Sequence, residues 1–214
     1  MYYPNKYEEH NIAQRKLIEI FNQTANKLGS EVEMYFQEHE NFRDDGGIIY
    51  KSTGEKILYD FEKRHTYYNT YKNFRFTELG QFERKIQKNE IKLSVQISTD
   101  ESGLILAWHE DYVRKNVNYI KSKTEDGKGE INGKRFTSDF IEISYKNIEI
   151  FYHILVKAFK EKKFNKESFK NFVLNNKIIC EYTGCNKGLT DKVYNYSIAK
   201  YQGRAYCYDC QKKV

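Results

Sequence analysis

Four cysteines close to the C-terminus have the spacing of a metal site. They are the only cysteines in the chain and form two close pairs, Cys180 with Cys185 and Cys207 with Cys210, separated by twenty-one residues. Two short pairs joined by a longer segment can place four thiolates about 2.3 Å from one tetrahedral zinc ion. Gly184 directly precedes Cys185, where a tight turn often needs a positive φ angle. We therefore expect a structural zinc ion, because four thiolates leave no open coordination position for catalysis.

Disulfide bonds and inert buried thiols are the alternatives for these cysteines. Disulfides require an oxidising compartment. The first residues, Met1 to Lys6, begin no apolar run that could be a signal peptide, so we expect reduced thiols. No window approaches the eighteen apolar residues of a membrane span, which predicts a soluble, cytoplasmic protein. A turn at residues 202–204 predicts a hairpin that delivers the second cysteine pair to the metal.

Positive charge is concentrated in the same part of the chain. From Lys160 onward there are twelve Lys or Arg against five Asp or Glu, whereas the first 159 residues have a net charge of −1. A basic metal module with many tyrosines suits phosphate contacts and stacking on bases or sugars, although lysine-rich segments can also serve solubility alone. The expected nucleic-acid contacts are Lys187, Lys192, Lys200, Arg204, Lys212 and Lys213.

The stretch from Tyr194 to Lys213 resembles the small C-terminal zinc ribbons of bacteriophage and bacterial DNA-recombination and repair proteins. This resemblance implies DNA as the partner, in a recombination, repair, restriction or phage-related setting. It names no activity, because such ribbons are attached to unrelated catalytic or annealing domains.

A second group of residues that could do chemistry is acidic and lies in the N-terminal part. Asp60 and Glu62 are two residues apart on a predicted strand, so their side chains share one face. A hairpin partner that enters at Asp44 or Asp45 could bring a third carboxylate near them. Three carboxylates can bind Mg²⁺ or Mn²⁺ and position a metal-bound water for attack on a phosphodiester. The alternative is a solvated acidic face.

The order of elements and this spacing are similar to the PD-(D/E)XK nuclease core. In that family an aspartate starts the second strand, and the third strand carries an acid-x-lysine pair. The resemblance implies Asp45 as the first acid, Asp60 as the second, and Mg²⁺-dependent cleavage. The lysine position holds Glu62 instead, and Lys63 follows one residue later, on the other face of the strand unless a bulge intervenes. His109 is a further possible metal ligand, although a single histidine there more often only ends a strand.

Hydrophobic periodicity predicts the elements that must position these residues. We expect a helix over 8–28 that ends at Gly29, and Gly46-Gly47 as a turn. The remaining expected elements are a strand at 31–37, a hairpin of 48–51 with 56–63, a helix at 77–87, strands at 91–98 and 104–109, an Asn132-Gly133 hairpin leading into a strand at 140–143, and helices at 146–163 and 166–175.

Together these elements predict an α+β domain with a mixed sheet over residues 1–176, with a possible nuclease-like core at 8–110. A zinc-ribbon domain over 177–214 follows. Three functions compete: a zinc-containing DNA-binding protein, a Mg²⁺-dependent nuclease whose ribbon grips its substrate, and a protein-binding inhibitor or adaptor in which zinc is only structural.

Overall fold

The structure is a computed structural model of the 214-residue chain. It describes residues 4–37, 45–64, 79–87, 90–113, 119–123 and 130–167, and, nearer the C-terminus, residues 178–180, 182, 185, 187–189, 193, 196–197, 200–201 and 206–214. For residues 4–7, 84, 119–123, 130–135, 178–179 and 188 it describes the backbone alone. Residues 168–175 of the predicted helix at 166–175 lie outside the described residues, as does the predicted turn at 202–204.

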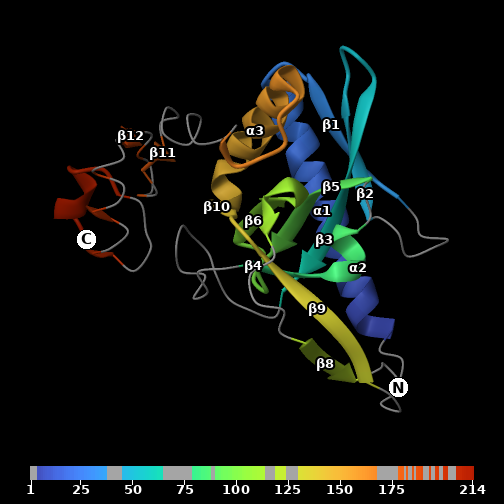
Figure 1. Cartoon of the computed structure of the whole chain (residues 1–214). Helices are drawn as coiled ribbons and strands as arrows, with labels where there is room; N and C mark the ends of the chain where they lie inside the picture. Colours follow the sequence, from blue (N-terminus) through green and yellow to red (C-terminus); the bar gives the residue numbers. More distant parts are fainter. Residues whose placement is uncertain are drawn as a thin grey trace.

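A six-stranded mixed sheet is the centre of the fold, with the strand order β1-β2-β3-β5-β6-β10 (Figure 1). Neighbouring strands are antiparallel except β3 and β5, which are parallel. The predicted α+β class with a mixed sheet is therefore confirmed. The strands of this sheet are β1 (Val32–Phe36), β2 (Gly46–Tyr50), β3 (Glu55–Lys63), β5 (Ile91–Ile97), β6 (Gly103–Trp108) and β10 (Ile141–Ser144).

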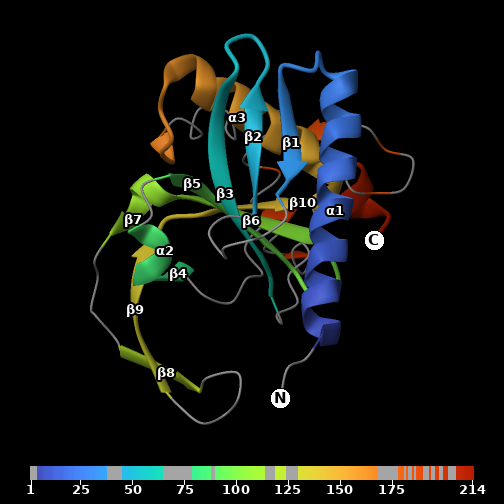
Figure 2. The ribbon, with the colours of Figure 1, turned by 90° about the vertical axis from the view of Figure 1, so that its right-hand side faces the viewer.

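Two long helices, α1 (Pro4–Lys27) and α3 (Ile148–Glu161), pack together against one face of this sheet (Figures 1 and 2). Phe21 of α1 meets Phe151 of α3 edge-to-face with ring centroids 5.1 Å apart, and Tyr50 of β2 stacks on Phe159 at 5.2 Å. The predicted helix of residues 8–28 ends as expected, because Gly29 adopts a φ of +113°. Neither helix is long and apolar enough to cross a membrane, and the same holds for every helix among the described residues.

A smaller sheet covers the other face of the large one. It has the order β4-β9-β7, and β8 pairs with β9. Ile105 and Ala107 of β6 are buried against Leu79 and Tyr112 of this layer, whereas Leu104 and Leu106 face the helices. Both faces of the central strands are therefore covered. The elements of this layer are β4 (Leu79–Phe82), α2 (Glu83–Ile86), β7 (Tyr112–Val113), β8 (Tyr119–Lys123) and β9 (Glu130–Ser138); the short helical turn η1 (His109–Asp111) links β6 to β7.

Two predicted elements are corrected here. The segment expected as one helix at 77–87 is β4 followed by the single turn α2, because Leu79 to Phe82 pair with β9. The hairpin expected at Asn132-Gly133 is absent, since both residues lie inside β9 and pair with β8. In both segments a long-range strand partner overrides the local turn or helix preference.

Gly46 and Gly47 are the first two residues of β2 rather than a turn. A Cβ atom on Gly46 would collide with the Tyr35 carbonyl oxygen and the Tyr59 ring, and one on Gly47 would collide with the Tyr35 ring. The glycines therefore permit tyrosine rings to pass directly over the strand, at the point where Asp45 enters the sheet.

Candidate metal centre and buried polar cluster

The four cysteines converge in the folded chain. Their sulfur atoms all lie within 4.8 Å of one another, and none forms a disulfide. The Sγ atoms of Cys185 and Cys207 are 3.8 Å apart, which matches the edge of about 3.8 Å in a tetrahedron with metal–sulfur bonds of about 2.3 Å. The donor set and its size therefore fit one tetrahedral metal ion.

Short backbone turns hold each cysteine pair in place. The hairpin of β11 (Ile178–Ile179) and β12 (Gly188–Leu189) carries the first pair, and the Cys180 amide donates to the Lys187 carbonyl at 2.8 Å. In the second pair, Cys207 precedes η3 (Cys210–Lys212) and Cys210 is its first residue. The Cys210 amide donates to the Cys207 carbonyl at 3.0 Å. The Cys207 amide in turn donates to the Cys180 sulfur at 3.1 Å, so the two turns are tied to each other.

The electrostatic environment favours one thiolate in this cluster. Burial by itself raises the pKa of the Cys207 thiol, but hydrogen bonds from Cys210 and from the neighbouring thiols outweigh it and lower the pKa to about 7. Metal binding requires deprotonated thiols, so a thiol that ionises near neutral pH assists the first step of loading.

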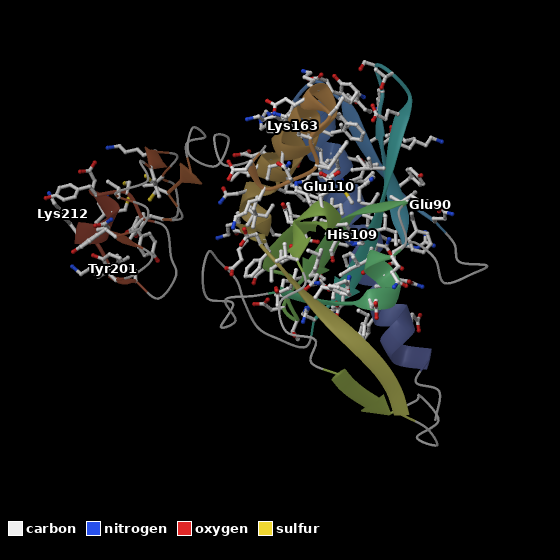
Figure 3. The ribbon with its side chains drawn as sticks, viewed as in Figure 1. Glu90, His109, Glu110, Lys163, Tyr201 and Lys212 are labelled. Atoms are coloured by element: carbon white, nitrogen blue, oxygen red, sulfur yellow. The ribbon has the colours of Figure 1, made fainter. Side chains whose placement is uncertain are left out.

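Beside the cysteine cluster lies a groove of about 400 Å³, which we call the tyrosine groove. Its lining contains Tyr196, Tyr201, Tyr208, Lys200 and Lys212. Val193 and Gln211 complete the lining. Figure 3 shows Tyr201 and Lys212 on the C-terminal segment that carries the cysteines.

The six predicted nucleic-acid contacts do not share one environment. Lys187 is ion-paired with Asp209 at 2.5 Å across the two cysteine turns, so its charge is matched within the protein. Lys200, Lys212 and Lys213 form no salt bridge to a carboxylate in the described part of the chain and lie instead against tyrosine rings. Lys192 and Arg204 lie outside the described residues.

The acidic residues predicted as catalytic lie where β2 and β3 meet. Gly46 pairs with Tyr59, so Asp45 enters beside Asp60, and its Oδ2 accepts a hydrogen bond of 2.6 Å from the Phe61 amide. Glu62 is 43% exposed and faces Arg64 at 3.7 Å. Among the described residues, the cysteines are the only group of three or more metal-ligating side chains that could hold an ion, so the three acids are not a preformed cation site.

Asp60 lies in what we call the buried polar cluster. Lys85 and Gln81 bind its carboxylate, Ser94 is its partner position on β5, Gln96 donates to Ser94 at 3.4 Å, and His109 is near enough for the Asp60 charge to act on it. Asp60 is only 3% exposed. Its Oδ1 is ion-paired with the Lys85 ammonium of α2, and its Oδ2 accepts a hydrogen bond of 3.0 Å from Gln81 of β4. A carboxylate buried on a strand thus gains its partners from the layer that covers it.

Lys85 is the one cation of this cluster, and the sequence did not single it out as a site residue. Burial alone would lower the pKa of its ammonium group, but the charge and hydrogen bond of Asp60, together with the charges of Asp45 and Glu62, raise it. All three predicted acids therefore act on this one cation. Lys63, the lysine of the sequence motif, points to the other face, where it pairs with Glu101 at 3.2 Å. One feature of the sequence could have pointed to Lys85. In the segment 77–87, Gln81 and Lys85 lie on the polar side, opposite the apolar residues.

His109 begins η1 directly after β6 and is 9% exposed, with neither ring nitrogen hydrogen-bonded (Figure 3). Burial lowers its pKa to about 4, against the opposing charge of Asp60 and with a further contribution from Lys85 and Lys92. The imidazole is therefore neutral at physiological pH.

This burial predicts a pH dependence of stability. Between pH 6.5 and 4 the unfolded chain protonates His109 and the folded chain does not, so acidification through this range destabilises the fold. Between pH 7 and pH 4.5 the free energy of unfolding of the wild type should fall by on the order of 2 kcal/mol more than that of His109→Leu, as measured by urea unfolding. Asp111 has the opposite effect on stability, because burial raises its pKa to about 6 and the folded chain takes up this proton before the unfolded chain does. The control Asp111→Asn should therefore lose more stability than the wild type on acidification. An unchanged difference between wild type and His109→Leu at the two pH values would contradict this prediction.

Comparisons of the chain with protein-family models, curated proteins and solved structures find no match. The functional conclusions below therefore depend on the residues and their geometry.

Proposed function

We propose that this protein binds nucleic acid, with DNA as the partner, through a zinc-stabilised C-terminal module. Four thiolates at tetrahedral spacing favour zinc, and a closed set of four sulfur ligands favours a structural role for the ion. The observation that carries the binding proposal is the group of exposed lysines Lys200, Lys212 and Lys213, which form no salt bridge among the described residues and lie over tyrosine rings. Such lysines can exchange their counterions for backbone phosphates.

The salt dependence of binding tests this proposal. A variant with Lys200, Lys212 and Lys213 changed to alanine should bind a DNA oligonucleotide more weakly than the wild type. The slope of log K against log salt should become shallower by about two to three units, because each of the three phosphate contacts contributes about 0.7 to 0.9.

A matched control changes three exposed lysines of the predicted 1–176 domain, Lys51, Lys160 and Lys162, which are paired with acids. Its slope should equal that of the wild type. An equal decrease of the salt slope in both triple variants would indicate general electrostatics rather than a C-terminal site. An unchanged slope in the Lys200/Lys212/Lys213 variant would reject the proposed surface.

A second candidate function is divalent-cation-dependent cleavage of a phosphodiester by the sheet domain. The observation that favours it is the ion pair of Asp60 with Lys85 beside the strand end where Asp45 enters the sheet, together with the action of the Asp45 charge on Lys85. Asp45 precedes the second strand and Asp60 lies on the third, as the PD-(D/E)XK resemblance implies, and Lys85 could supply the lysine from another element. A hard cation would bind the carboxylate oxygens of Asp45 and Asp60, where it must compete with the Lys85 ammonium.

Plasmid and oligonucleotide substrates with Mg²⁺, Mn²⁺ or EDTA test this second function. Metal-dependent cleavage by the wild type should be lost in Asp45→Asn and in Lys85→Met, whereas Glu33→Gln, an exposed acid of β1, should retain it. Absence of cleavage by the wild type with either metal would remove the nuclease candidate and leave the binding proposal intact.

A further inference from the structure

The tyrosine groove presents aromatic faces rather than charge alone. Tyr196 is 53% exposed and Tyr208 is 65% exposed, and both line the groove. Both rings therefore offer apolar faces to a ligand in the groove, and tyrosine is a side chain enriched at binding interfaces.

The third ring of the groove, Tyr201, is fixed by its surroundings. Its hydroxyl donates to the Gln211 carbonyl oxygen at 3.0 Å, and its ring meets Tyr206 edge-to-face at 5.5 Å. Gln211 is in turn tied to the Tyr206 carbonyl at 2.9 Å by its side-chain amide. One wall of the groove is therefore pre-organised by the turn that holds Cys207 and Cys210, and ligand binding need not order it.

Two lysines lie on the exposed rings. The Lys212 ammonium is 4.7 Å from the ring centre of Tyr208. Lys200 lies 5.5 Å from the ring centres of both Tyr196 and Tyr201 and donates to the Tyr196 hydroxyl at 3.1 Å. Each cation is within reach of the phosphate of a nucleotide whose base stacks on the neighbouring ring.

We propose that the tyrosine groove binds an unpaired base, so that the C-terminal module prefers single-stranded over double-stranded nucleic acid. This inference rests on the proposed nucleic-acid function and adds its substrate class. Inside a duplex both faces of a base are covered by its neighbours, and only base edges and phosphates are accessible. Tyrosine faces inside a groove can stack only on a base whose own face is free, whereas a duplex would contact the lysines at the rim alone.

The test compares a single-stranded oligonucleotide with the duplex of the same sequence, using fluorescence anisotropy and the full chain with its metal. The wild type should bind the single strand at least about tenfold more tightly. The double variant Tyr196→Leu/Tyr208→Leu should lose roughly 10- to 100-fold in affinity for the single strand, because base–aromatic stacking contributes about 1 to 3 kcal/mol per base. Its duplex affinity and its salt slope should remain those of the wild type, since no charge is removed.

Two controls separate stacking from a loss of fold. Tyr196→Phe/Tyr208→Phe keeps the ring faces and should retain the single-strand preference, and zinc content should be equal in all variants. A fluorescent base analogue such as 2-aminopurine should be quenched by the wild type and not by the leucine variant.

The outcomes distinguish this inference from the function on which it rests. Salt-dependent binding with equal affinity for single strand and duplex, or with no effect of the leucine substitutions, overturns the inference and leaves the proposed function standing. Absence of binding to either form overturns both.

Discussion

Replacing Cys207 by serine is expected to cost the C-terminal module both its metal and its fold. Cys207 is buried, and its amide and sulfur connect the two cysteine turns, since the amide donates to the Cys180 sulfur and the sulfur lies 3.8 Å from that of Cys185. A segment of this size has too little apolar material to fold unaided, so the free energy of metal binding is the larger part of its folding free energy.

The measurements are metal content and local unfolding. Elemental analysis of the wild type should find about one zinc per chain, and Cys207→Ser should fall below about half an equivalent. Limited proteolysis should then cut within residues 177–214. The single tryptophan, Trp108, packs against Phe164 at 5.3 Å in the sheet domain, and its fluorescence should be unchanged.

Asp209→Ser is the matched control, because Asp209 lies in the same turn but is exposed and contacts Lys187 at the surface. It should keep its metal. Retention of zinc and of protease resistance by Cys207→Ser would contradict the metal-centre assignment. A simultaneous change in Trp108 fluorescence would contradict the predicted boundary between 1–176 and 177–214.

The second large effect is expected from Asp60→Asn, which should destabilise the sheet domain by about 2 to 4 kcal/mol. The substitution preserves the shape of the side chain but leaves the Lys85 ammonium in a mostly buried position without its carboxylate. Removing one partner of a fully buried pair costs about 3 to 5 kcal/mol, and the 26% exposure of Lys85 reduces this value.

Urea unfolding followed by Trp108 fluorescence provides the measurement. The double variant Asp60→Asn/Lys85→Met should be less destabilised than the sum of the two single variants, because the uncompensated charge is gone. Glu62→Gln is the control on the same face of β3, and it should change stability by less than about 1 kcal/mol, because Glu62 is largely solvated. If the two single substitutions changed the free energy of unfolding additively in the double variant, Asp60 and Lys85 would not be energetically coupled.

The elements with strong local signals were predicted correctly from the sequence. Alternation of Val32 and Met34 predicted β1, the glycine-containing turn at residues 52–55 predicted the β2–β3 hairpin, and the apolar stripe containing Phe151 and Phe159 predicted α3. The two cysteine pairs likewise predicted their own convergence, because their spacing defines the ligand set before any tertiary contact is known.

The composition of the buried polar cluster was not predictable in this way. Periodicity along β5 placed Leu93 and Val95 on one face and Ser94 and Gln96 on the other, without indicating what covers the polar face. Ser94 and Gln96 are both fully buried because the β4-β9-β7 layer covers that face. A period of two reports that the faces of a strand differ, but not whether a distant segment covers the polar one.

The sequence by itself therefore determined the long helices and the β2–β3 hairpin, which depend on neighbours within a few residues, and the cysteine ligand set, which follows from residue type and pair spacing. Only the tertiary structure decided that β3 pairs in parallel with β5, that residues 79–82 form a strand, and that Lys85 rather than Lys63 faces Asp60. These features arise from pairing between segments twenty or more residues apart, where burial and hydrogen bonding outweigh local propensity.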